Sequence, residues 1–163
     1  MAVTSKVDEV RKEVDRLAGS VHSASELMEK IVRLLHGRML KYNWVGFYML
    51  ENSTSSQPAA LVLGPFQGAI TPHTRIPLNQ GICGAAAATG KTLVIDDVSA
   101  DARYLPCSSE TKSEIVVPIF VKNEVVGELD IDSHFPAAFD DEDRELVQHC
   151  AALVGKLLER SGA

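Results

Sequence analysis

Two cysteines in loop-like segments are the side chains of this sequence best suited to covalent chemistry. Cys107 lies in the polar segment RYLPCSSETKSE, which lacks helical or strand periodicity, and Pro106 before it disfavours a helix. Cys83 lies between glycines in NQGICGAAAATG, where a loop enters a short predicted helix whose amide donors can stabilise a thiolate. Both patterns suit a reactive thiol, and both also suit a small buried hydrophobe or a neutral loop residue.

The third cysteine and the histidines indicate no metal site. Cys150 falls on the apolar stripe of a predicted C-terminal helix, where a buried structural thiol is expected. Structural zinc takes about four ligands, commonly in close pairs, but His73 and His134 are scattered and no C-x-x-C or H-x-x-x-H occurs. Nucleotide-binding, P-loop, serine-hydrolase and zinc-protease motifs are missing as well. We therefore expect no metal and no cofactor, and a zinc-binding domain stays an alternative that metal analysis would test.

A row of carboxylates follows the segment that carries Cys107. In VVGELDID, strand geometry sends Glu128, Asp130 and Asp132 to one face and the aliphatic residues between them to the other. Such a row is most often the solvated face of an antiparallel sheet. However, Glu114 begins the partner strand of the same predicted hairpin. If the Cys107 loop folds over this face, thiol and carboxylates share a pocket that would bind an ammonium group and could hold a protonated acid.

Three of the nine aromatic residues lie in the short segment WVGFYML, as Trp44, Phe47 and Tyr48. Trp44 and Tyr48 are four residues apart, so in a strand their side chains point to the same face. They suit an ordinary core. They also suit a cage for an apolar methylthio group or a cation.

Helical periodicity at both ends of the chain supplies the elements that must position these residues. Apolar residues at spacings of three and four predict a helix over about 7–17. Ser23 and Glu26 form a capping-box pattern at the start of a second helix, whose apolar face is expected to extend to Leu40. A last helix is expected to begin after Asp140 as its N-cap.

Between these helices the periodicity and turn residues are those of strands. The expected elements are strands at 44–50, 60–63, around 74–76, 92–95, 115–121 and 125–132, and a short helix at 85–88. Turn residues between the first two and between the last two of these strands, the latter Lys122-Asn123-Glu124, predict two hairpins. Terminal helices around hairpin-connected strands predict an α+β, three-layer domain.

The bulk composition is that of one globular domain: 163 residues, 45% hydrophobic and 23% charged. A net charge of −6 without a basic patch argues against a nucleic-acid partner. No run of about 18 apolar residues predicts a membrane span. The first 20 residues lack a secretory-signal pattern and the cysteine count is odd and low, so a reducing, cytoplasmic compartment is expected.

Eight segments in a fixed order form the most specific pattern in the chain. They are NWVGFY at 43–48, GPFQG at 64–68, RIPLNQGICGAAAATG at 75–90, IDDV at 95–98, the Cys107 loop, SEIVVPI at 113–119, GELDIDS at 127–133 and FDDED at 139–143. Together they resemble the GAF-domain free methionine-(R)-sulfoxide reductases, from about residue 25 to 158. The resemblance implies one GAF-type domain over 1–163, with residues 1–20 as an N-terminal helix. It also implies an antiparallel sheet with helices on both faces, a pocket closed by loops, and a homodimer.

The resemblance also assigns roles to individual residues. Cys107 occupies the position of the family's nucleophile, and Cys83 matches a cysteine that can resolve the oxidised intermediate. Many relatives carry a further cysteine where this chain has His73, so resolution falls to Cys83. The acids that hold the substrate's amino group and polarise its sulfoxide, and the pocket aromatics, match Glu114, Asp130, Asp132, Trp44 and Tyr48.

The implied reaction is thiol-dependent reduction of free methionine-(R)-sulfoxide. Glu114 or Asp132, kept neutral by neighbouring carboxylates, would protonate the sulfoxide while the Cys107 thiolate attacks sulfur and becomes a sulfenic acid. Cys83 would then form a disulfide, which an external dithiol such as thioredoxin reduces. The alternative is a GAF module without activity that senses a small molecule or redox state, and Cys107→Ser would separate the two.

Overall fold

The computed structural model describes residues 5–106 and 109–162. In this part of the chain six strands form one sheet, in the order β3-β2-β1-β6-β5-β4, and every neighbouring pair is antiparallel. The strands are β1 (Trp44–Glu51), β2 (Ala60–Gln67), β3 (Arg75–Pro77), β4 (Leu93–Ile95), β5 (Ser113–Val121) and β6 (Glu124–Ser133). All six match predicted strands, and both predicted hairpins are confirmed.

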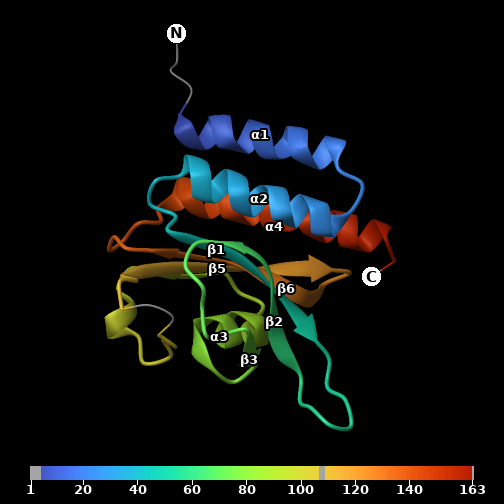
Figure 1. The fold of residues 1–163 in the computed structure, drawn as a ribbon, viewed down its shortest axis with the longest axis vertical. Helices are drawn as coiled ribbons and strands as arrows, with labels where there is room; N and C mark the ends of the chain where they lie inside the picture. Colours follow the sequence, from blue (N-terminus) through green and yellow to red (C-terminus); the bar gives the residue numbers. More distant parts are fainter. Residues whose placement is uncertain (1–4, 107–108, 163) are drawn as a thin grey trace.

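Helices cover both faces of the sheet (Figure 1). The helices are α1 (Lys6–Ser20), α2 (Ala24–Arg38), α3 (Gly81–Thr89) and α4 (Asp141–Arg160), with a 3₁₀ turn, η1 (Val98–Ala100). In Figure 1, α1, α2 and α4 stack on one face of the sheet, and α3 lies on the other. The α+β, three-layer prediction is therefore confirmed.

The helix starts follow the predicted capping chemistry. The Ser23 hydroxyl accepts the Glu26 amide at 3.1 Å, but the Glu26 carboxylate accepts from the His22 amide and not from Ser23, so half of the predicted box forms. At the start of α4, Asp140 and Asp143 make a complete box, each accepting the other's amide at 3.0 Å.

Several predicted element ends were wrong. The helix predicted at 85–88 is longer and begins at Gly81, and the strand predicted at 60–63 continues to Gln67. Leu40 is 89% exposed because α2 ends at Arg38, so the apolar face of that helix stops short of it. The turn between β5 and β6 has two residues and not three. Lys122 and Asn123 have φ of 50° and 69°, the left-handed pair that closes a tight hairpin.

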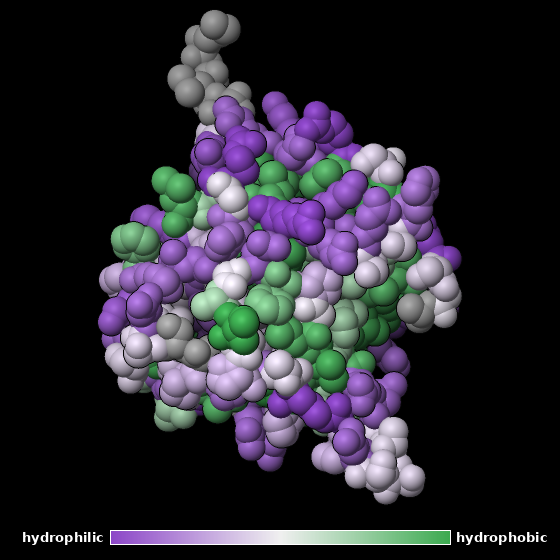
Figure 2. Space-filling view, in the orientation of Figure 1, coloured by the Kyte–Doolittle hydropathy of each residue, from purple (hydrophilic) through white to green (hydrophobic). Residues whose placement is uncertain are grey.

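The larger hydrophobic core lies on the face of the sheet that α1, α2 and α4 cover. Leu129 and Ile131 on β6 are fully buried there, and so is Cys150 on α4, which confirms that this thiol is buried as predicted. Burial raises the pKa of the Cys150 thiol to about 12, which keeps it protonated and inert. Figure 2 shows hydrophilic side chains over α1 and α2, and apolar side chains gathered below this helical layer. No helix among the described residues is long and apolar enough to span a membrane.

Candidate active site

The acidic row of β6 is buried under α3 and is not a solvated face. Glu128 is 0% exposed, and Asp130 and Asp132 are no more than 3% exposed. Glu114 of β5 is directly opposite Asp132 in the sheet register and is equally buried. The more common interpretation, a wet sheet face, is therefore wrong. Because the sheet is covered on both sides, the same alternation sends four carboxyl groups into the interior.

These carboxyl groups share a low-dielectric space without a balancing cation. Burial is the largest cause that raises the pKa of all four: Glu114, Glu128, Asp130 and Asp132. For Glu114 the neighbouring Asp130 and Asp132 raise it further. In the described chain, no lysine or arginine forms an ion pair with any of them. This cluster therefore holds protons to higher pH than solvated carboxyl groups do, and an ammonium group among the acids would stabilise their ionised forms.

The Cys83 thiol, on α3, lies next to the acids of the sheet. Cys83 occupies the first turn of α3 and is 6% exposed. The Sγ atom of Cys83 and one carboxylate oxygen each of Glu114 and Asp130 all lie within 4.8 Å of one another, close enough to hold a cation. The spacing of these residues in the sequence did not indicate this arrangement. Burial, followed by Asp130, Glu128 and Glu114, raises the pKa of the thiol well above its usual value. Burial and the neighbouring acids thus act against the thiolate that the helix start was expected to stabilise.

The aromatic pair closes the β1 side of the row. Trp44 is opposite Asp132 and Tyr48 is opposite Glu128 in the register, and the two rings stack with centroids 6.2 Å apart. Gly46 between them is required, because a Cβ there would lie 2.2 Å from the Trp44 ring. The indole can thus lie flat across the sheet, beside the acids.

Hydrogen bonds and a third ring fix these aromatics in place. The Trp44 indole donates to the Ala69 carbonyl at 3.0 Å, and the Tyr48 hydroxyl donates to the His73 carbonyl at 2.8 Å. Phe66 stacks on Trp44 with centroids 5.7 Å apart. Sequence reasoning missed Phe66 because the strand predicted at 60–63 ends before it, whereas β2 continues to Gln67.

Cys107 lies outside the described residues, but the chain just before it reaches the site. Leu105 lines a small hollow together with Cys83, Glu114 and Asp130. The ring Nε2 of His73 lies 2.7 Å from the carbonyl oxygen of Pro106, an acceptor, so this nitrogen carries the proton. The residue that replaces the further cysteine of many relatives therefore contacts the segment that leads into Cys107.

Two hollows adjoin the acids in this structure. The one under Leu105 has about 10 Å³, room for no more than about one water. The other has about 220 Å³ and is lined by Trp44 and Asp132, with Glu110, Thr111 and His134 at its rim. In place of the single pocket expected around the thiol and the acids, there are thus two separate hollows, and the acids lie between them.

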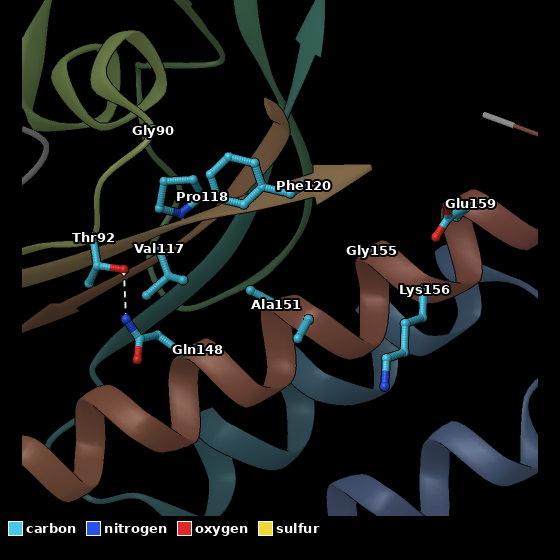
Figure 3. A pocket seen from close by; sticks show the side chains of 11 residues that line it. Gly90, Thr92, Val117, Pro118, Phe120, Gln148, Ala151, Gly155, Lys156 and Glu159 are labelled. Atoms are coloured by element: carbon cyan, nitrogen blue, oxygen red, sulfur yellow. Dashed lines mark hydrogen bonds between the residues drawn. The ribbon is translucent and has the colours of Figure 1, made fainter. Parts of the chain in front are cut away.

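A larger hollow elsewhere lacks this chemistry. Figure 3 shows the side chains that line a cavity between β5, the chain after α3, and α4. The volume of this cavity is about 350 Å³. Its walls include Val117, Pro118 and Phe120, and one side chain hydrogen bond crosses it, from Gln148 to the Thr92 hydroxyl at 3.0 Å. Neither a cysteine nor the acidic row lines it, so size alone does not mark the active site.

The fold and this acidic, thiol-bearing site define a GAF domain, and residues 23–158 match the GAF domain family. The chain belongs, within it, to the family of free methionine-R-sulfoxide reductases. It is 42% identical over 125 residues to the Escherichia coli K12 protein of that name, covering 77% of this chain and 72% of that one.

Solved structures agree with this assignment. The X-ray structure of the free methionine-R-sulfoxide reductase from Neisseria meningitidis in complex with its substrate matches with a TM-score of 0.87 at 32% identity. The match covers 100% of this chain and 97% of that chain. The type II enzyme from Thermoplasma acidophilum matches with a TM-score of 0.77 at 35% identity, over 88% and 96% of the two chains.

Proposed function

We propose that this chain reduces free L-methionine-(R)-sulfoxide to methionine. The observation that carries the proposal is the buried row of carboxyl groups next to Cys83, with no basic side chain of the described residues paired to it. An ammonium ion is the group that such a row accommodates best. Relatives named for this activity, one of them solved with its substrate, support the choice of sulfoxide.

The acids serve two purposes in the proposed reaction. Asp130 and its neighbours hold the ammonium group, and a carboxyl kept protonated by burial, Glu114 or Asp132, hydrogen-bonds to the sulfoxide oxygen. A sulfoxide is a poor electrophile until its oxygen is protonated or strongly hydrogen-bonded, so this acid is needed for attack. Trp44 and Tyr48 provide an apolar wall for the methylthio end.

The thiols carry the two electrons. The Cys107 thiolate attacks the sulfoxide sulfur while the buried acid protonates the oxygen. The hydroxyl then passes to the Cys107 sulfur, so that the S–O bond to methionine breaks as the S–O bond to Cys107 forms; methionine leaves with its sulfur reduced by two electrons and Cys107 becomes a sulfenic acid. Cys83 then condenses with it to form a disulfide and water. A thioredoxin-like dithiol restores both thiols, and the acting form is a homodimer in the cytoplasm.

The same acids explain a preference for the free amino acid. A methionine sulfoxide residue within a peptide offers a neutral amide where the free amino acid offers an ammonium ion. The buried acids would then stay without their counter-charge, a loss that sites built for a polar group tolerate poorly.

The proposal is tested by thioredoxin-coupled NADPH oxidation with free R- or S-sulfoxide. We expect turnover with the R epimer only, none in Cys107→Ser, and at most one turnover in Cys83→Ser. Cys150→Ala is the matched control, since this thiol is buried on the opposite side of the sheet. A wild-type protein that is folded and gives no turnover would refute the proposal and favour a sensor module.

A further inference from the structure

The Cys83 thiol and two of the buried carboxyl groups meet at one small hollow. The Cys83 Sγ atom and one carboxylate oxygen each of Glu114 and Asp130 lie within 4.8 Å of one another. The same three residues line the hollow of about 10 Å³ under Leu105, whose room for about one water is also room for one bare metal ion. Three different elements, α3, β5 and β6, each supply one of these side chains.

Oxygen atoms at this hollow lack other partners. Asp130 is 2% exposed, and its Oδ1 atom has no hydrogen-bond partner among the described residues. The same holds for Oδ1 of Asp132, which is opposite Glu114 in the sheet register and on the same face of β6 as Asp130. Buried carboxylates are normally paired or bound to a metal, and a buried oxygen without a partner points to a missing one. A cation between these side chains would supply it.

The mixture of ligand atoms determines which cation fits. Carboxylate oxygens alone suit Mg²⁺ or Ca²⁺, which take six or more oxygen ligands. One sulfur with two carboxylate oxygens instead suits Zn²⁺, a borderline-soft ion that commonly takes three protein ligands and a water. Tetrahedral zinc ligands lie about 3.5 Å apart, so the three atoms need to approach by no more than about 1 Å. Coordination deprotonates a thiol outright, so the raised pKa of Cys83 does not prevent binding.

We propose that Cys83, Glu114 and Asp130 bind Zn²⁺ reversibly, with a water as the fourth ligand. The protons of the thiol and of the acids leave to solvent as the ion binds, and nothing is oxidised or reduced. The site is argued from the geometry alone. Its consequence rests on the proposed function: the ion takes the place of the substrate's ammonium group, because both cations need the same acids, so zinc and substrate exclude each other.

The test of the site is metal binding to the reduced, full-length chain without substrate. Equilibrium dialysis with ZnCl₂ should give one ion per chain, and an equal concentration of Mg²⁺ should not displace it. Co²⁺, a spectroscopic substitute for zinc, should give a thiolate-to-metal charge-transfer band. Cys83→Ser should remove this band and weaken zinc binding by about 10²-fold or more. Cys150→Ala is the matched control, with its thiol on the opposite face of the sheet, and should keep both.

Two results would overturn the site. One is a reduced wild type that binds no zinc. The other is a band that persists in Cys83→Ser, since a different thiol would then hold the ion. Asp130→Asn gives a second reading that does not depend on the folding of Cys83→Ser: it should keep the band but bind zinc at least about tenfold more weakly, and wild-type affinity in this variant would also overturn the inference.

Competition separates this inference from the proposed function. In Cys107→Ser, where no turnover consumes the thiols, free methionine-(R)-sulfoxide should lower zinc occupancy in the dialysis. Alanine at the same concentration chelates zinc in solution through the same amino and carboxylate groups but lacks the side chain for the aromatic wall, so it should lower occupancy much less. Equal effects of the two amino acids would overturn the proposed exclusion. A zinc-free wild type that gives no turnover would instead refute the proposed function.

Discussion

Replacing Asp132 by asparagine should make the protein more stable at neutral pH. Asp132 is 3% exposed, and burial followed by the charge of Asp130 raises its pKa well above 3.8. A carboxyl with a raised pKa in the folded state holds a proton that the unfolded chain has lost. The folded state therefore binds more protons than the unfolded state in the window between the two pKa values, and stability falls as pH rises through it.

The size of the effect follows from the count of protons. One proton held only by the folded state lowers the free energy of unfolding by about 1.4 kcal/mol per pH unit. Asp132→Asn removes one such group, so within that window the variant should gain about 1.4 kcal/mol relative to wild type for each pH unit. Acids with lowered pKa, such as Asp97 and Asp140, titrate below this window and do not contribute.

Urea unfolding at intervals between pH 5 and 8 measures this slope. Asp96→Asn, which removes an exposed carboxylate, is the control and should keep the wild-type slope. Equal slopes in Asp132→Asn and wild type, or a wild-type stability that rises across the window, would show that these acids do not hold protons in the folded state.

Three further substitutions probe the aromatic wall and the remaining thiol. Gly46→Ala places a Cβ 2.2 Å from the Trp44 ring, so thermal melting should show a loss of stability of about 1–3 kcal/mol. KM for the sulfoxide should rise because the indole moves. An unchanged KM would contradict the role of Trp44. Trp44→Phe removes the 3.0 Å hydrogen bond to the Ala69 carbonyl, which contributes about 1 kcal/mol. Steady-state kinetics should therefore show a severalfold higher KM with a small change in kcat. A lower kcat at constant KM would count against a binding role for Trp44. Cys150→Ala leaves a small cavity that should lower the free energy of unfolding in urea by about 1–2 kcal/mol. Turnover per folded molecule should stay at the wild-type level. Loss of turnover would place this thiol in the reaction.

Local patterns predicted the elements of this fold well, because caps, turns and strand periodicity act within a few residues. Ser23 and Asp140 cap their helices as expected, and the β5–β6 hairpin forms with the alternation that puts the acids on one face. The errors of the prediction concern the ends of helices and strands. Leu40 continues the apolar spacing of α2, but the helix stops at Arg38 and leaves it exposed.

The environment of the site could not be predicted from the same patterns. Alternation places Glu128, Asp130 and Asp132 together, but whether that face is wet or dry depends on α3 and Leu105, which come from distant parts of the chain. The pKa of Cys83 depends on the same tertiary packing. A helix start favours a thiolate, but the acids beneath it reverse the effect, and only the assembled layers reveal which influence is larger.

The burial that makes the acids suited to an ammonium group also limits what Cys83 can do. A sulfoxide must be attacked by a thiolate, and a thiol surrounded by carboxyl groups, with its pKa raised, has little thiolate at neutral pH. Cys150 is equally unsuitable, since it is buried in the helical core on the opposite side of the sheet. The raised pKa of Cys83 is thus compatible with the proposal, taken from the family resemblance, that Cys107 attacks the sulfoxide and Cys83 acts in the second step, where a sulfenic acid is a far better electrophile. The division of labour between the two cysteines is therefore the one that the family resemblance implies, and the electrostatics around Cys83 agree with it.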